Sequence, residues 1–152
     1  MTIRRALLLL AAVLATQAQA NDRYSTRDIE LYSVALPTTE LTAEAAKNYN
    51  VERSPTRGLL TVTLVKKGKS GGNETVVGQV YAGAINLNNN LSNIPIREVH
   101  EGGSVYYLGE FQVATPDTLR FLVNANVLGK VMKSEFAREF HGPRDVSAQQ
   151  LK

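Results

Sequence analysis

The stretch REVHEGGSVYYLGEF, residues 97–111, shows how this chain is built. Apolar and polar side chains alternate on both sides of the paired glycines Gly102 and Gly103. Alternation with period two is typical of a half-buried β-strand, and glycines between two such runs are typical of a β-hairpin. The stretch therefore predicts two antiparallel strands, at residues 95–101 and 105–113, joined by a tight turn.

The same pattern repeats along most of the chain. The predicted strands cover residues 28–36, 59–67, 75–87, 95–101, 105–113, 119–128 and 130–140. About seven short strands linked mostly by hairpin-length turns are typical of an antiparallel sandwich. We therefore predict an all-β fold, an immunoglobulin-like antiparallel β-sandwich with Greek-key connections.

One short helix is predicted near the N-terminus, at residues 41–49. Thr42 is a suitable N-cap, and Leu41 can pack onto Ala46 across the first turn. The alanines of this segment favour helix, and the segment has room for only about two turns. All other elements are expected to be strands and loops.

Turns and glycine positions are predicted in the second half of the chain. Residues 88–93 are rich in asparagine and predict a polar loop. The segment Leu128-Gly129-Lys130-Val131 predicts a two-residue hairpin of type II′, with Gly129 at the first turn position. Gly78 and Gly83 lie inside a predicted strand, where glycine is typical of a bulge or of a close backbone approach.

The loop length of the 97–111 hairpin decides which way its polar side chains point, because a shift of one residue moves every side chain to the other face. A two-residue loop places Glu98 opposite Tyr107. It also places His100 opposite Val105, so that both polar side chains enter the face expected to line the core. A three-residue loop, which includes Ser104, places them on the solvent face. We expect the three-residue loop, because it keeps the charges hydrated.

The N-terminus has the order of a secretory signal peptide. Two arginines at positions 4 and 5 precede an unbroken apolar run over residues 6–15. Small residues at Ala18 and Ala20 then match a signal-peptidase cleavage site. The apolar run is too short to span a bilayer, which takes about 20 residues. We expect residues 1–20 to be removed, leaving a protein in the periplasm of a Gram-negative bacterium.

Composition limits the chemistry of the mature chain. Without Arg4 and Arg5, the 17 basic residues fall to 15 against 14 acidic ones, so charge gives no argument for nucleic acid as a partner. The chain has no cysteine, which excludes disulfides, thiolate nucleophiles and cysteine metal sites. We expect one domain over residues 21–140 and a mobile C-terminal tail over residues 141–152.

One candidate binding surface combines a loop with the hairpin. Arg53 and Arg57 flank a proline turn, where two guanidinium groups could bind a carboxylate or phosphate. Loop arginines are, however, mostly just exposed side chains. Tyr106 lies on the expected solvent face of the hairpin and extends this surface.

A second candidate group is Glu98, His100 and Glu110, all expected on the solvent face of the hairpin. A small ligand, a metal or an enzymatic reaction could use them. A closed metal site usually needs three or four good ligands, and the only other histidine, His141, lies at the start of the tail. No nucleophile elbow or zinc-protease motif is present. We therefore predict no cofactor, no metal and no catalytic residue.

Several segments resemble the exported proteobacterial proteins grouped as domain-of-unknown-function family 4426. The more specific ones are the Tyr-Ser-x-x-x-x-Thr-x-x-Leu pattern that begins at Tyr32, the pair Arg53-Ser54 and the run Tyr106-Tyr107-Leu108. The similar segments are residues 30–65, 96–99, 106–111, 118–126 and 134–140. The resemblance implies a signal peptide and a periplasmic β-rich domain, and it implies no known activity.

The leading functional hypothesis is a non-enzymatic module that binds a protein, a peptide or another envelope component through a sheet edge or a loop end. The alternatives are a small-ligand or metal binder, or an enzyme, using Glu98, His100 and Glu110, and a structural subunit of an envelope complex. The ligand and the oligomeric state do not follow from the residues.

Overall fold

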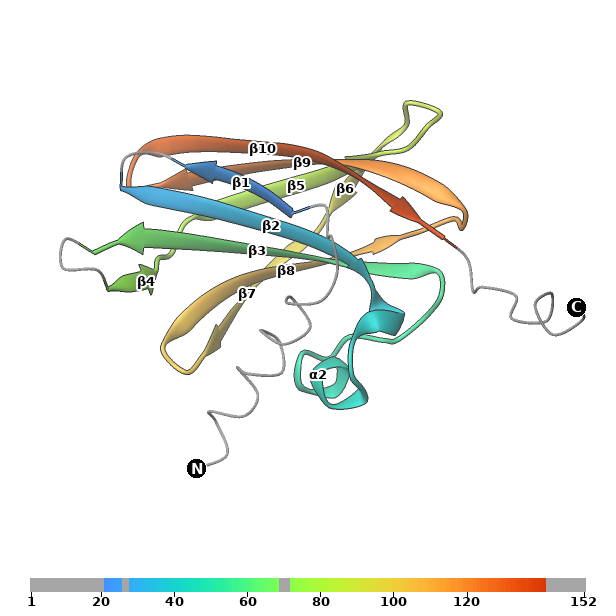
Figure 1. Ribbon diagram of the computed structural model, residues 1–152, viewed down its shortest axis with the longest axis horizontal. Helices are drawn as coiled ribbons and strands as arrows, with labels where there is room; N and C mark the ends of the chain where they lie inside the picture. Colours follow the sequence, from blue (N-terminus) through green and yellow to red (C-terminus); the bar gives the residue numbers. More distant parts are fainter. Residues whose placement is uncertain (1–20, 26–27, 69–71, 142–152) are drawn as a thin grey trace, which may run out of the picture.

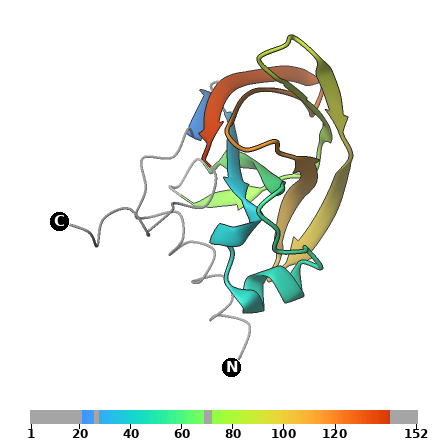
Figure 2. The same ribbon diagram turned by 90° about the vertical axis from the view of Figure 1, so that its right-hand side faces the viewer.

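Two antiparallel sheets face each other across one apolar core in the computed structural model, which describes residues 21–25, 28–68 and 72–141 (Figure 1, Figure 2). In the first sheet the strand order is β1-β2-β3-β8-β7, and β4 pairs with β3. In the second sheet the order is β10-β9-β5-β6. The predicted signal peptide and residues 142–152 of the predicted tail lie outside the described residues.

The strands are β1 (Asn21–Ser25), β2 (Ile29–Pro37), β3 (Arg57–Lys67), β4 (Asn73–Thr75), β5 (Gln79–Ile85), β6 (Leu91–Ile94), β7 (Ile96–Glu101), β8 (Ser104–Gln112), β9 (Asp117–Val127) and β10 (Lys130–Phe140). The order β2-β3-β8-β7 is the A-B-E-D order of an immunoglobulin-type sandwich, and β10-β9-β5 is its G-F-C sheet. The predicted sandwich is therefore confirmed. Three short strands, β1, β4 and β6, raise the strand number above the predicted seven.

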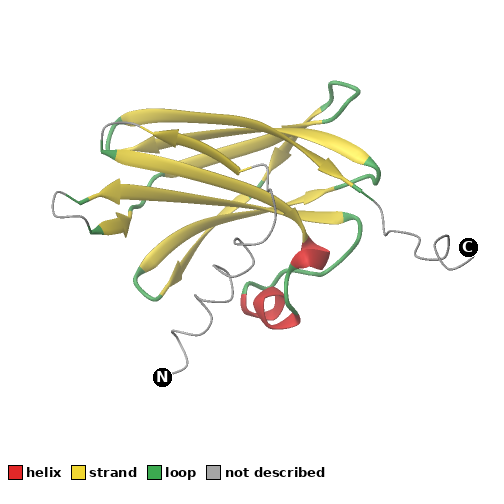
Figure 3. Ribbon diagram, in the orientation of Figure 1, coloured by secondary structure: helices red, strands yellow, loops and turns green. Residues whose placement is uncertain are grey.

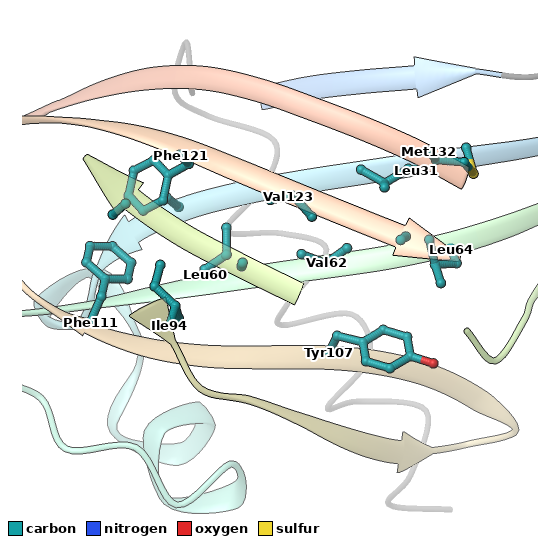
Figure 4. Close-up of a cluster of buried hydrophobic side chains, with 14 of the residues drawn as sticks. Leu31, Leu60, Val62, Leu64, Ile94, Tyr107, Phe111, Phe121, Val123 and Met132 are labelled. Carbon is teal, nitrogen blue, oxygen red and sulfur yellow. The ribbon is translucent and has the colours of Figure 1, made fainter. Parts of the chain in front are cut away.

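The core lies between the inner faces of the two sheets (Figure 4). In β9, alternate residues from Leu119 to Val127 are buried, and the residues between them are exposed or half-buried. Phe121 is fully buried and packs edge-to-face against Phe111, with 4.9 Å between ring centroids. Burial of each large apolar side chain contributes about 2 kcal/mol, so this period-two pattern determines which face of each strand points inward.

A short helical segment packs on one end of the outer face of the first sheet (Figure 3). It consists of the 3-10 turn η1 (Thr38–Glu40) and helix α2 (Ala43–Asn48), which is shorter than the predicted 41–49. The Thr42 hydroxyl accepts a hydrogen bond from the Ala45 N–H at 3.1 Å, as predicted for an N-cap. Leu41 and Ala46 are buried together in a second apolar cluster. Among the described residues, no helix is long and apolar enough to cross a membrane.

The predicted strand at 75–87 is two strands in two different sheets. β4 pairs with β3, whereas β5 pairs with β9, so the chain crosses between the sheets at residues 76–78. Val76 within the crossing and Val80 after it both pack against the core, which explains why the apolar alternation continues through the crossing. At Gly78 a Cβ atom would come within 2.8 Å of a Leu64 methyl group, so the predicted close approach is confirmed.

Two turns begin or end at other residues than the sequence predicted. The predicted loop at 88–93 contains β6, because the Asn86 side chain closes the loop early. Its Oδ1 accepts hydrogen bonds from the N–H groups of Asn88 at 3.1 Å and Asn90 at 3.0 Å. The last hairpin turns at Leu128-Gly129, where φ is +51° and +77°. Positive φ at both positions is the type I′ pattern, so the predicted type II′ turn is wrong.

Ser33 lies on the inner face of β2 and is fully buried. Its hydroxyl has no hydrogen-bond partner among the described residues. An unpaired buried hydroxyl costs stability, so Ser33→Ala is expected to raise the free energy of unfolding by about 1 kcal/mol in urea denaturation. Thr38→Val serves as the control, because the equally buried Thr38 hydroxyl is bonded to the Ser54 backbone. The control is expected to lose stability, and a loss in Ser33→Ala as well would contradict the interpretation.

Candidate functional site

The hairpin of β7 and β8 has a two-residue turn. Glu101 pairs with Ser104, and the turn residues Gly102 and Gly103 have φ of +56° and +82°. This is again the type I′ pattern, which only glycine adopts readily at both positions. The expected three-residue loop is therefore wrong. Glu98 consequently lies on the inner face of the sheet.

The inner-face position of Glu98 is compatible with stability for two reasons. First, β7 is an edge strand, so its inner face is open to solvent at the rim, where the Glu98 side chain is 36% exposed and that of His100 is 64% exposed. Second, Glu98 Oε2 lies 3.1 Å from the Tyr107 hydroxyl, and Glu98 Oε1 lies 2.5 Å from His100 Nε2. The carboxylate is thus hydrogen-bonded rather than stranded in the core.

Tyr107 connects this group to the crossing between the sheets. Its hydroxyl accepts a hydrogen bond from the Gly78 N–H at 2.8 Å and lies 2.9 Å from the Gly78 carbonyl oxygen. Burial of the ring raises the pKa of Tyr107, and the Glu98 carboxylate raises it further. These contacts are structural, since they tie the end of the hairpin to the chain that enters β5.

Glu98, His100 and Glu110 do not converge on one site. Glu110 lies on the outer face of β8, opposite Leu59 of β3, whereas Glu98 and His100 lie on the inner face. Glu110 contacts Arg57 instead, with 3.4 Å between Oε2 and Nη1. Among the described residues, no group of three or more histidine, aspartate or glutamate side chains is arranged to hold a metal ion.

The two loop arginines have separate roles. Arg53 Nη2 donates a hydrogen bond to the Thr39 carbonyl oxygen at 3.0 Å. Arg57 lies between two carboxylates, with Nε 3.4 Å from Glu52 Oε2 and Nη1 at the same distance from Glu110. The two guanidinium groups thus have different partners, and they do not form the joint anion site that was considered as a possibility. Of the two, Arg57 is the one placed beside a cleft.

Tyr106 and Tyr49 meet where α2 packs on the outer face of the sheet. Tyr106 is half-buried, and Tyr49 is buried with its hydroxyl donating to Glu101 Oε2 at 2.7 Å. Burial is the main cause that raises the pKa of Tyr49, followed by the Glu101 carboxylate and by Tyr106. Tyr106 is thus a half-buried neighbour of Tyr49 on the outer face of β8.

The raised pKa of Tyr49 predicts a loss of stability in alkali. In the unfolded chain this tyrosine ionises near pH 10, whereas in the folded protein it stays neutral to higher pH. The contribution of neutral Tyr49 to the free energy of unfolding is full below about pH 10, and it decreases as the pH rises toward the folded-state pKa. Urea denaturation from neutral pH to about pH 11 should therefore show a smaller alkaline loss for Tyr49→Phe than for the unmodified protein. An equal decrease in the free energy of unfolding with pH in the two proteins would contradict this.

The main cleft lies where β6 and β8 diverge and has a volume of about 400 Å³. Its apolar floor includes Phe111, Ile94 and Leu119. Figure 4 shows Ile94 and Phe111 side by side at one end of the core. Polar residues form the rim: Asn86, Asn90, Ser92, Asn93, Gln112 and the charged Arg57, Glu110 and Asp117.

The crossing of the chain at Pro95 creates this cleft. β6 is the edge of the second sheet, and after Pro95 the chain enters β7, the edge of the first sheet. β7 pairs with β8 only as far as Gly109, so residues 110–112 of β8 pair with β3 on one side alone. The cleft thus lies between the free edge of β6 and the end of β8.

Arg57 lines two further clefts at the same end of the molecule. One, of about 340 Å³, is bordered by η1 and Phe140, and the other, of about 370 Å³, by α2 and Glu110. The clefts all open at the end where β3 begins and β8 ends. Of the predicted site residues, Arg57 thus lines all three of these clefts and Glu110 lines two of them.

Most of the cleft rim was not predicted as a site. The asparagine-rich run at residues 88–93 is visible in the sequence, but it was predicted as a polar loop, whereas residues 91–93 belong to the edge strand β6. Asp117 and Gln112 carry no local signal, because only the sheet pairing brings them beside Asn93.

The comparisons with known proteins agree with the fold. The family model described as "Domain of unknown function (DUF4426)" matches residues 24–142. A crystal structure of a DUF4426 family protein from Pseudomonas aeruginosa is similar, with a TM-score of 0.68 and 22% sequence identity, over 84% of this chain and 99% of that chain. No curated protein matches the sequence. The chain belongs to the DUF4426 family, as the residues around Tyr32 and Tyr106 predicted.

Proposed function

We propose that this protein is a non-enzymatic binding module of the bacterial cell envelope, and that its partner is an envelope protein or peptide. The observation that carries the proposal is the cleft between β6 and β8. It combines an apolar floor with a rim of exposed amide and hydroxyl groups, which is the usual composition of a binding site.

The polar groups of the rim suit recognition better than proton transfer. The amides of Asn90, Asn93 and Gln112 both donate and accept hydrogen bonds at neutral pH without a change of charge. The carboxylates are engaged in structural contacts, Glu110 with Arg57 and Asp117 with the N–H of Thr118 at 2.8 Å. These features favour reversible binding of a polar, partly apolar ligand.

The periplasmic location rests on the N-terminal sequence. The order of arginines, apolar run and Ala-x-Ala pattern in residues 1–20 supports export. Mass spectrometry of the protein purified from the periplasmic fraction should find a chain that begins at Asn21. Recovery of the chain with residues 1–20 in the cytoplasm would contradict export.

Site-specific photo-crosslinking in cells tests the binding role. A photoreactive residue at Gln112, exposed at the cleft, is expected to give a discrete adduct with an envelope protein or peptide. The same residue at Asn124, exposed on the outer face of β9 outside the cleft lining, is the matched control and should give none. The proposal fails if position 112 gives no adduct or if both positions give the same products.

A further inference from the structure

We infer that the cleft takes an extended, basic segment of a partner protein, which adds as a strand to the free edge of β6. The inference rests on the proposed binding function and specifies the class of ligand. Three features of the described residues carry it: the backbone groups that β6 leaves unpaired, the lack of charge on that edge, and the charges inside the cleft.

The hydrogen-bond pattern shows which backbone groups of β6 point away from the sheet. The N–H of Asn86 donates to the Asn90 carbonyl oxygen at 3.2 Å, so these two residues form a hydrogen-bonded pair. Such pairs alternate along antiparallel strands, so Ser92 and Ile94 bond to β5. The N–H and C=O groups of Leu91 and Asn93 therefore point to the free edge, where a new strand can pair with them.

β6 differs from the other outer strands in its lack of charge. Its sequence LSNI has no charged residue; the strand is short, with four residues, and Pro95 follows its last residue. β7 carries Arg97, Glu98 and Glu101, β4 carries Glu74, and β1 and β10 also contain charged residues. Charges on edge strands discourage pairing with other chains. The edge of β6 lacks this protection.

The alternation of side chains connects the new strand with the cleft. A strand added beside β6 would point every second side chain inward, toward the apolar floor around Phe111. The other side chains would point outward beside Leu91, which is 65% exposed. One segment can thus fill the cleft with apolar groups and cover an exposed apolar residue.

The charges of the cleft favour a basic segment. Its lining holds Glu110 and Asp117 against the single Arg57, and Arg57 is shared with Glu52. Within the described part of the chain, no cation contacts Asp117. An arginine or lysine of the segment is therefore expected to lie beside Asp117, with the other side chains uncharged.

Selection of binding peptides tests the inference. The probe is a displayed library of random linear peptides, panned on the purified protein without its signal peptide. Selected peptides should contain basic residues and bind with an affinity that falls about tenfold or more when alternate peptide N–H groups are methylated, since each lost hydrogen bond weakens binding. Selection of no peptide, or no effect of methylation, would overturn strand addition.

Two variants test whether the selected peptides bind at the free edge of β6. Asn93→Pro removes an N–H that points to the free edge, and Asn93→Lys adds a charge there; both should weaken the selected peptides by about tenfold. Asn124→Lys adds the same charge to an exposed asparagine of β9 and should bind as the unmodified protein does. Thermal denaturation shows whether each variant folds. If Asn93→Pro does not fold, Asn93→Lys alone decides, and unchanged binding in it would overturn the inference.

The two proposals fail in different ways. If crosslinking at Gln112 gives a partner whose binding Asn93→Lys does not affect, the binding function stands and strand addition is wrong. If the partner captured there is a glycan or a lipid rather than a polypeptide, strand addition and the proposed polypeptide partner are both wrong, and only binding at the cleft stands. If position 112 gives no adduct and no peptide is selected, both proposals are wrong.

Discussion

Replacing Gly58 with alanine is expected to lower the free energy of unfolding by about 3 kcal/mol, which corresponds to a fall of roughly 10 °C in the melting temperature. Gly58 is buried in β3 directly beneath the ring of Phe111. A Cβ atom at Gly58 would lie 2.2 Å from the ring Cζ and 2.3 Å from Cε2, far closer than non-bonded carbons approach. Either the ring or the strand must move.

The surroundings of Phe111 make any displacement of its ring energetically costly. Its ring packs edge-to-face against Phe121 at 4.9 Å and against Phe140 at 5.6 Å, so displacement disturbs the core of both sheets. The same ring forms part of the cleft floor. Thermal and urea denaturation of Gly58→Ala measure the effect.

Gly72→Ala is the matched control for Gly58→Ala. Gly72 is exposed, and a Cβ atom there would meet no atom within 4 Å. Its expected change in the free energy of unfolding is at most about 0.5 kcal/mol. If Gly58→Ala were as mild as the control, the close packing of Phe111 on β3 would be refuted.

Replacing Tyr107 with phenylalanine is the second large expected effect, a loss of about 2 kcal/mol in the free energy of unfolding. The change keeps the buried ring and removes only the hydroxyl. The Gly78 N–H and the Glu98 carboxylate then each lose a hydrogen-bond partner on the inner side of the sandwich. Glu98 keeps its contact with His100, whereas the Gly78 N–H loses the Tyr107 hydroxyl. Leaving a half-buried donor unpaired costs more than an average hydrogen bond contributes.

Tyr106→Phe provides the control on the adjacent residue. Tyr106 points to the opposite face of β8, and within the described part of the chain its hydroxyl makes no hydrogen bond. Its replacement should change the free energy of unfolding by no more than about 0.5 kcal/mol in urea denaturation. Equal losses in the two variants would show that the Tyr107 hydroxyl does not anchor the crossing at Gly78.

The strand pattern was predictable because burial repeats every second residue. The predicted last strand at 130–140 matches β10, and the predicted strand at 28–36 matches β2 to within one residue at each end. Local signals sufficed in these strands, because each has one face against the core along most of its length.

The register of the 97–111 hairpin was not predictable from the same rule. Glu98 was expected to face solvent because every residue on the inner face was assumed to be shielded from water. In the structure β7 is an edge strand, so an inward residue there still reaches water. Tyr107, which pairs with Glu98 across the strands, also supplies a hydrogen bond that depends on the register itself.

The cleft was not predicted, because it too depends on how distant strands are arranged. Ser92 and Asn93 of β6 and Gln112 of β8 come together only because the chain changes sheets at Pro95. Nothing local to these residues encodes that change. Arg57 and Glu110 were identified because charged residues are conspicuous in the sequence, whereas the uncharged residues of the cleft rim were not.

Amide hydrogen exchange of β6, followed by NMR with a selected peptide bound, tests the central claim most directly. Strand addition predicts new protection and chemical-shift changes at the N–H groups of Leu91 and Asn93, which point to the free edge. The N–H groups of Val131 and Lys133 on β10, the opposite edge of the same sheet, should stay unchanged. Protection centred on the His100 end of the hairpin, with none at Leu91 and Asn93, would contradict the account.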